Sequence, residues 1–172
     1  MKCIFDTVRE RDMDLLFMES IASDTEFVKT ILQVASLPTD NFKVISVHLS
    51  KTELDLGESD ITAIVEIDKT RYGILIEDKI DAIAMDNQYG RYIERGKLGM
   101  KNGEYEDFKI FVFSPKKYHD NNNEALKYDY FISYEEHLEY FKQKEDLLSR
   151  VRCQQLEQAI TKAKTPSSVT LN

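Results

Sequence analysis

Three charged side chains, Asp60, Glu77 and Lys79, suggest a specific chemistry. Two carboxylates brought to one point repel each other unless a cation lies between them. Mg²⁺ or Mn²⁺ suits that position, because hard divalent cations take carboxylate and water oxygens as ligands. A lysine beside the metal can stabilise developing negative charge, or help a metal-bound water to lose its proton. Together these groups would be able to cut a phosphodiester bond.

A β-hairpin with a four-residue turn, residues 68–71, is the element that would bring these side chains together. Pairing Ile67 with Tyr72 across the turn places Asp60 opposite Lys79 and on the same face as Glu77. Residues that are opposite or two apart share a face of a sheet, so the three side chains would converge. A shift of one residue would move Asp60 to the other face.

These residues resemble the signature of the PD-(D/E)XK nuclease superfamily, in which an acid is followed, after an aliphatic strand, by Glu77-Asp78-Lys79. Asp60 matches the first acid, and Ser59 stands where the superfamily name has proline. Gln88-Tyr89-Gly90-Arg91-Tyr92 after the lysine strand and Glu10-Arg11 at the start of the first helix extend the resemblance, which covers about residues 9–114.

The resemblance implies a metal-dependent nuclease. Asp60, Glu77 and the backbone carbonyl of Asp78 would hold Mg²⁺ or Mn²⁺, and Lys79 would orient or help activate the attacking water. Glu10 would add a further metal-side contact. Its place near a helix N-terminus favours a carboxylate, although Glu19 competes with it for this role.

The helix expected after the lysine strand would present one polar face toward the site. Gln88, Tyr92 and Arg95 are spaced i, i+4 and i+7 and share that face, with Arg91 at its edge. This face could reach a substrate phosphate or the attacking water. Gln88 is therefore also a catalytic candidate, and the candidates for substrate binding are Gln88, Arg91, Tyr92 and Arg95.

The hydrophobic pattern predicts an α/β (α+β) fold, a central mixed β-sheet of about five strands flanked by helices, as in the restriction-endonuclease-like core. One or two helices are expected over 10–33, with Ser23 and Glu26 as a capping box at the restart. Asp81 would cap a helix at about 82–96, ended by Gly96 and Gly99, and residues 119–124 read as a loop. Strands are expected at 42–49, 60–67, 72–78, 108–113 and 128–132, and C-terminal helices at 133–142 and 145–164.

With 172 residues the chain is expected to form a single domain, residues 1–172. Its core would span about 9–132, followed by the helices within 133–164 and a polar tail, 165–172. The two cysteines, Cys3 and Cys153, and the three scattered histidines have no metal-ligand spacing. No signal peptide or membrane span is evident, which favours the cytoplasm and no membrane partner.

The net charge of −8 argues against nucleic acid as a partner, because phosphate-binding proteins usually show a basic footprint. Local charge matters more than the sum, and a bound cation offsets clustered carboxylates. We therefore expect a nuclease, with DNA favoured over RNA, and a role in restriction, repair or defence by analogy. The alternative is a catalytically inactive adaptor of the same fold that binds nucleic acid or protein. The last helix is the candidate contact for a homodimer.

Overall fold

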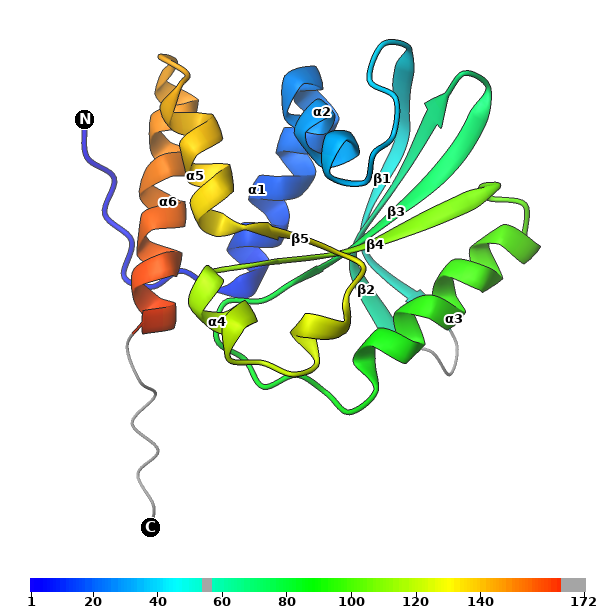
Figure 1. Ribbon diagram of the computed structural model, residues 1–172. Coiled ribbons are helices and arrows are strands. Elements are labelled where there is room, and N and C mark those ends of the chain that lie inside the picture. Colours follow the sequence, from blue (N-terminus) through cyan, green and yellow to red (C-terminus); the bar gives the residue numbers. More distant parts are fainter. Residues whose placement is uncertain (54–56, 165–172) are drawn as a thin grey trace.

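The computed structural model describes residues 1–53 and 57–164, in which a five-stranded sheet is flanked by helices on both faces (Figure 1). The strands lie in the order β1 (Phe42–Glu53), β2 (Gly57–Ile67), β3 (Thr70–Asp78), β4 (Asp107–Ser114) and β5 (Tyr130–Ser133). The first three strands are antiparallel, and β3, β4 and β5 are parallel. The helices are α1 (Glu10–Ser23), α2 (Thr25–Val34), α3 (Gln88–Lys101), α4 (Lys116–Asp120), the short η1 (Ala125–Lys127), α5 (Tyr134–Lys142) and α6 (Leu147–Lys164). The predicted fold class is thus confirmed.

Alternation along β3 explains why both faces of the sheet are covered. Ile74 and Ile76 point into the larger core, which includes residues of α1, α2, α5 and α6. Leu75 points the other way, into a smaller core where Tyr92 of α3 and Tyr105 pack. Successive residues of a strand face opposite sides of a sheet, so a strand that is apolar on both faces needs helices on both.

The turn between β2 and β3 is two residues long, not four. Ile67 pairs with Thr70, and Asp68 and Lys69 form the turn with φ values of 48° and 71°. Positive φ at both central positions is the mark of a tight hairpin turn whose twist matches the strands. The predicted pairing of Ile67 with Tyr72, and of Asp60 with Lys79, is therefore wrong by two residues.

The first helical region contains two helices, and the residue that caps the second is Asp24. Its Oδ1 accepts a hydrogen bond from the Phe27 amide at 3.1 Å. The predicted capping box from Ser23 to Glu26 is wrong, because the Ser23 hydroxyl donates to the Glu19 carbonyl inside α1. An ionised carboxylate one residue later is the stronger acceptor for an N-cap.

Helix α3 begins at Gln88 instead of Ala82 and continues through Gly96 and Gly99 to Lys101. These two glycines do not end the helix. A Cβ on Gly96 would lie 2.3 Å from the Phe108 ring, and one on Gly99 would lie 2.1 Å from the Tyr105 hydroxyl. Glycine is therefore required for close approach of α3 to the sheet, and the predicted boundaries of this helix are wrong at both ends.

The C-terminal part follows the prediction with local corrections, among them the strand expected at 128–132, which is observed as β5 at Tyr130–Ser133. Ser133 and Glu136 form the expected capping box of α5. Residues 116–120 form the short α4, so the predicted loop starts only after Asp120. On α6, Leu148 is 54% exposed, while Leu156 and Ile160 are buried. The predicted tail, 165–172, lies outside the described residues. Among the residues that the structure describes, no helix is both long enough and apolar enough to cross a membrane.

His137 of α5 gives the fold a testable dependence on pH. Its ring is 2% exposed and packs against Phe17, Phe27 and Phe113 at centroid distances of 4.8, 5.3 and 4.5 Å. Burial lowers the pKa of His137 to about 3. The unfolded chain takes up this proton near pH 6.5 and the folded protein does not, so stability falls as the pH drops below 6.5.

We expect His137→Phe to remove this sensitivity, because the new ring fills the same aromatic cluster without a titrating nitrogen. Between pH 7 and pH 5 the free energy of unfolding of the wild type should fall by about 2 kcal/mol relative to the variant. Urea unfolding at both pH values measures the difference. An equal change in the two proteins would contradict the prediction.

Candidate functional site

Acidic side chains from three elements, β2, β3 and α1, meet where β3 ends. β3 contributes Glu77 and Asp78 and is followed directly by Lys79, and β2 contributes a third carboxylate, Asp60. Ile61 pairs with Ile76, so Asp60, one residue earlier, comes beside Glu77, one residue later. The two-residue error in the predicted register leaves the faces unchanged, since side chains alternate with a period of two. Asp60, Glu77 and Lys79 are therefore brought together. The elements around them are α1 and α3.

Glu77 is the most enclosed acid on the α3 side, with 3% of its side chain exposed. Its Oε1 accepts a hydrogen bond from Gln88 Nε2 at 2.6 Å and lies 3.0 Å from Lys79 Nζ. Its Oε2 accepts a hydrogen bond from the Tyr92 hydroxyl. A carboxylate has about four lone-pair positions, and these three donors occupy three of them. One position, on Oε2, is thus left for a further ligand.

Asp60 is fixed at the same point by two backbone contacts. Its Oδ2 accepts a hydrogen bond from the Asp78 amide at 2.8 Å, and its own amide donates to the Tyr92 hydroxyl at 3.3 Å. Burial and the neighbouring Glu77 and Asp14 raise the pKa of Asp60 to about 9. The low dielectric and the adjacent acids both oppose ionisation of this carboxyl.

Lys79 lies between Glu77 and Glu10. Glu10 is the first residue of α1; its Oε1 accepts a hydrogen bond from the Ile80 amide at 3.1 Å, and its Oε2 is 4.0 Å from Lys79 Nζ. Burial opposes the charge on Lys79, but Glu77 and Glu10 outweigh this effect and hold the pKa of Lys79 above its usual range. Glu19 is exposed further along α1. The structure thus brings Glu10 to the site and leaves Glu19 on the surface.

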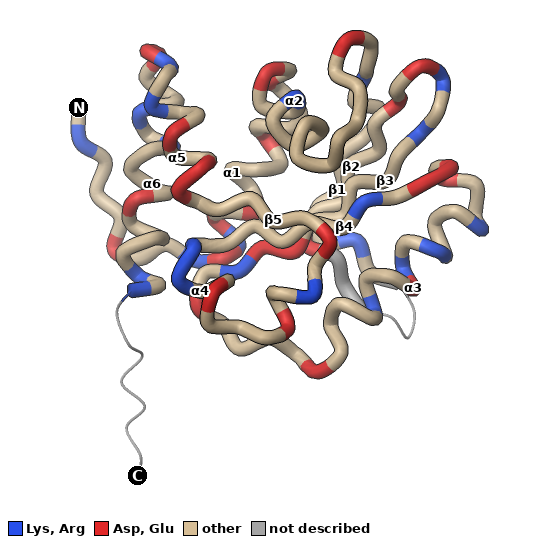
Figure 2. The backbone as a smooth tube through the Cα atoms, in the orientation of Figure 1, with Lys and Arg blue, Asp and Glu red and all other residues tan. Residues whose placement is uncertain are grey.

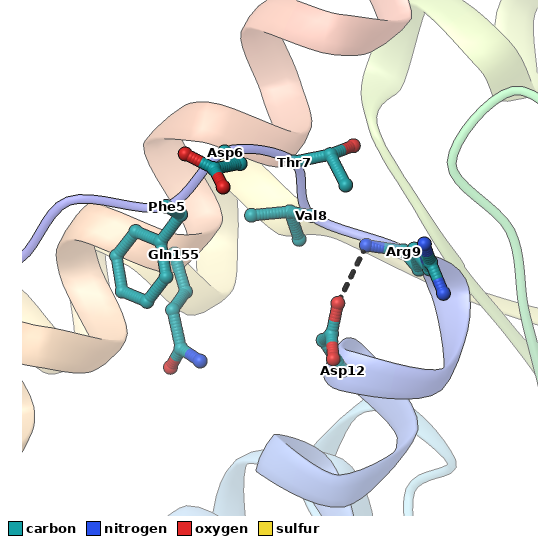
Figure 3. Close-up of a pocket in the computed structure, with 7 residues that line it drawn as sticks. All are labelled: Phe5, Asp6, Thr7, Val8, Arg9, Asp12 and Gln155. Carbon is teal, nitrogen blue, oxygen red and sulfur yellow. Dashed lines mark hydrogen bonds between the residues drawn. The ribbon is translucent and has the colours of Figure 1, made fainter.

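The start of α1, and with it Glu10, is fixed by a local contact. The Arg9 amide donates to Asp12 Oδ2 at 2.8 Å, as the dashed line in Figure 3 shows. The same close-up shows a hollow between the N-terminal segment and α6. It is lined by Phe5, Asp6, Thr7, Val8, Arg9, Asp12 and Gln155. It is therefore separate from the acidic cluster.

Asp14 and Tyr134 belong to this region and were not predicted. Asp78 points to the face opposite Glu77, is 1% exposed, and accepts a hydrogen bond from the Tyr134 hydroxyl of α5. Burial and the neighbouring Asp14 raise the pKa of Asp78. Burial also raises the pKa of Asp14. Asp14 follows Glu10 by four residues and so shares its helix face, a signal that the sequence offered. Nothing in the sequence marked Tyr134.

The polar face predicted on α3 is present, but most of it is buried. Gln88, Tyr92 and Arg95 are all at most 9% exposed. The guanidinium carbon of Arg95 lies 4.1 Å from the centre of the Tyr92 ring, a cation–π contact that supports the tyrosine. Arg91 donates to the Asp86 carbonyl at 2.7 Å. Within this structure Gln88 and Tyr92 position Glu77.

The acidic cluster supplies only part of the ligand shell of a divalent cation. Across residues 1–53 and 57–164, no three His, Cys, Asp or Glu side chains are grouped to hold a metal ion. Mg²⁺ commonly takes only one or two protein carboxylates, with water and substrate oxygens completing its shell. Asp60 and Glu77, with the backbone carbonyl of Asp78 between Glu77 and Lys79, fit that smaller requirement.

The raised pKa of Asp60 predicts that this residue costs stability when no metal is bound. The unfolded chain releases the Asp60 proton near its ordinary value of 3.8, and the folded protein keeps it until about pH 9. Stability therefore falls as the pH rises between these values. We expect Asp60→Asn to be more stable than the wild type in EDTA, by a margin that grows by up to about 1.4 kcal/mol per pH unit from pH 5 to pH 8.

Thermal and urea unfolding of both proteins in EDTA measure this margin. Asp40→Asn, which changes an exposed acid, is the matched control and should show no growing difference. A margin for Asp60→Asn that is independent of pH would contradict the prediction.

Comparisons of the chain with protein-family models, curated proteins and solved structures gave no match. The acidic cluster and the elements that carry it are thus the features of the described residues that bear on function.

Proposed function

We propose that this protein is a divalent-metal-dependent nuclease that hydrolyses phosphodiester bonds in nucleic acid. The observation that carries the proposal is the convergence of Asp60, Glu77 and Lys79 at the end of β3. Burying two carboxylates side by side is unfavourable without a cation, and a structural role gives little reason to do it. The known uses of such an arrangement include binding of Mg²⁺ or Mn²⁺.

Asp60, Glu77 and the carbonyl of Asp78 would hold the metal. When bound, it would supply a Lewis acid for the phosphoryl oxygen and lower the pKa of a coordinated water. Asp60 is well placed for this because one of its oxygens is already fixed by the Asp78 amide. Glu77 is aligned by Gln88 and Tyr92.

Lys79 would act as a charged donor. Its neighbouring acids keep it protonated, and 13% of its side chain reaches solvent. A protonated lysine cannot take a proton from water, but it can orient the water and stabilise the negative charge that develops on the phosphate. Glu10, 4.0 Å from Lys79, would hold the ammonium group in place and present its carboxylate to the metal side of the site.

A group of neighbouring lysines could attract nucleic acid although the net charge of the chain is −8. Figure 2 shows lysines of α4 and of the C-terminal end of α6 next to each other, and Lys117 Nζ donates to the Lys164 carbonyl at 3.1 Å. Phosphates are attracted by local rather than total charge. DNA is the substrate that we propose first, with restriction, repair or defence as the setting by analogy.

A second function is supported by the contacts of Glu77. Because Lys79, Gln88 and Tyr92 together satisfy this carboxylate without a metal, the same fold could serve as an adaptor that binds nucleic acid or protein without turnover. Cleavage and metal binding decide between the two functions.

We expect the wild type to cleave labelled DNA in Mg²⁺ or Mn²⁺ and not in EDTA. Asp60→Ala and Lys79→Ala should each lower the rate by at least about 100-fold, because each removes a charge used in the transition state. Circular duplex DNA, single-stranded DNA and RNA are the substrates to compare. Lys29→Ala, which changes a surface lysine paired with Glu26, is the matched control.

Two results would contradict the proposal that this protein is a nuclease. Full activity in both site variants would remove the assigned residues from the mechanism. Absence of cleavage, together with calorimetry showing no Mn²⁺ binding that depends on Asp60, would favour the adaptor.

Glu10 and Glu19 give a further test, since both are acids of α1. Glu10→Gln keeps an acceptor for the Ile80 amide but removes the charge beside Lys79, so the cleavage rate should fall by about 10-fold. Glu19→Gln should be unchanged. Steady-state cleavage with equal amounts of folded protein makes the comparison, and equal rates for the two variants would exclude a contribution of Glu10 to catalysis.

A further inference from the structure

Asp78 is the residue of β3 whose backbone faces the proposed metal site. Its amide donates to Asp60 Oδ2 at 2.8 Å, and the next amide, that of Lys79, donates to the Phe113 carbonyl of β4 at 3.0 Å. The N–H and C=O of one peptide unit point in opposite directions, so the Asp78 carbonyl points away from β4 and toward β2, which carries Asp60. The regular pairing of β3 with β2 stops at Ile76, and a further contact is therefore needed to fix the direction of this carbonyl.

The side chain of Asp78 receives such a contact from the opposite layer. The Tyr134 hydroxyl donates a hydrogen bond to Asp78 Oδ1, and the two residues are 0% and 1% exposed. Among the hydroxyl and amide groups of the described residues, that of Tyr134 is the donor that reaches this carboxyl group. Burial raises the pKa of Tyr134, so its hydroxyl keeps the proton that it donates. Because a buried carboxyl group without a donor is unfavourable, the contact holds the end of β3 in place.

Tyr134 is itself fixed by the sheet and by its own helix. It is the first residue of α5, which lies on the same side of the sheet as α1 (Figure 1). Ser133 ends β5 and caps α5, and its hydroxyl accepts a hydrogen bond from the Glu136 amide at 3.0 Å. The Tyr134 ring packs against the Phe17 ring of α1 with centroids 5.5 Å apart. A side chain held in this way can orient the residue that it binds.

We propose that Tyr134 is a positioning residue of the metal site, because it holds Asp78 in the orientation that directs the backbone carbonyl toward Asp60. This inference rests on the proposed nuclease function. Tyr134 acts through Asp78 and not by contact with the substrate. Its one hydrogen bond sets the direction of two backbone groups, the amide that binds Asp60 and the carbonyl assigned to the metal. Residues that orient metal ligands commonly contribute about 10- to 100-fold to metal affinity.

Tyr134→Phe removes the hydroxyl and keeps the ring. Tyr140→Phe is the matched control, because it removes the same kind of contact from the same helix. The Tyr140 hydroxyl donates to Asp24 Oδ2 at 2.8 Å, and Asp24 caps α2. Asp24 follows the end of α1, whereas Glu10 begins this helix of 14 residues, which is about 21 Å long. The control contact is therefore far from the acidic cluster.

The wild type and both variants are compared by three measurements. Calorimetry gives the Kd for Mn²⁺, DNA cleavage over a range of Mg²⁺ concentrations gives the half-saturating concentration and kcat, and thermal unfolding in EDTA gives the stability. For Tyr134→Phe we expect the Kd for Mn²⁺ and the half-saturating Mg²⁺ concentration to rise by about 10-fold. Its kcat at saturating Mg²⁺ should stay within about 3-fold of the wild type, because the bound metal meets the same ligands. Tyr140→Phe should lose stability to a similar extent and match the wild type in metal binding and cleavage.

The outcomes separate this inference from the proposed function. Metal affinity of Tyr134→Phe that matches the wild type would overturn the role of Tyr134 and leave the nuclease standing. An equal loss of metal affinity in Tyr140→Phe would also overturn it, since the loss would then follow stability. If the wild type neither cleaves DNA nor binds Mn²⁺ through Asp60, the nuclease fails and this inference fails with it. If it binds Mn²⁺ without cleaving, calorimetry alone decides for Tyr134.

Folding of the Tyr134→Phe protein is measured by circular dichroism, with and without sucrose, which favours the compact state. A variant that folds in sucrose is compared with the other two proteins under that condition. A variant that stays unfolded there would overturn the inference, because Tyr134 would then serve the fold and not the metal site.

Discussion

The enclosed carboxylate of Glu77 sets the arrangement of the elements around it. A buried charge of this kind requires hydrogen-bond donors, and these come from Lys79 on the same segment and from Gln88 and Tyr92 on α3. Because the Tyr92 hydroxyl also accepts from the Asp60 amide, one side chain joins α3 to both β2 and β3. The position of α3 against the sheet follows from these contacts.

The end of β3 also places a buried carboxyl group, that of Asp78, on the other face of the sheet. Glu77 and Asp78 are neighbours in β3, so their side chains point to opposite sides. Asp78 accepts a hydrogen bond from the Tyr134 hydroxyl of α5, and Asp14 of α1 lies close to it. The end of β3 is thus held between two helical layers, which fixes the backbone carbonyl that the proposed metal site uses. Burying several acids at the end of β3 lowers the stability of the fold, and such a loss of stability is typical of functional sites.

Some features of the site followed from local pattern, and others did not. The convergence of Asp60, Glu77 and Lys79 was predicted with a hairpin register that was wrong by two residues. The face assignment was correct all the same, because only an odd shift changes the face. The start of α3 was missed because Asp81 looked like a cap, although residues 79–87 pass the site before the helix begins at Gln88. Gly96 and Gly99 looked like helix stops, and only the proximity of Phe108 and Tyr105 explains them.

The sequence by itself determined the fold class, the order of the elements and the residue types that could hold a metal. These three features depend on hydrophobic periodicity and on the chemistry of residues that are close together in the sequence. Only the tertiary structure decided that Glu10 and not Glu19 reaches Lys79, and that Asp14 and Tyr134 lie at the site. It also decided that Tyr92 is a buried hydrogen-bond donor to Glu77 and that the buried Arg95 packs on the Tyr92 ring. Such contacts join residues far apart in the sequence, and they depend on how closely helices pack on the sheet, which no local pattern specifies.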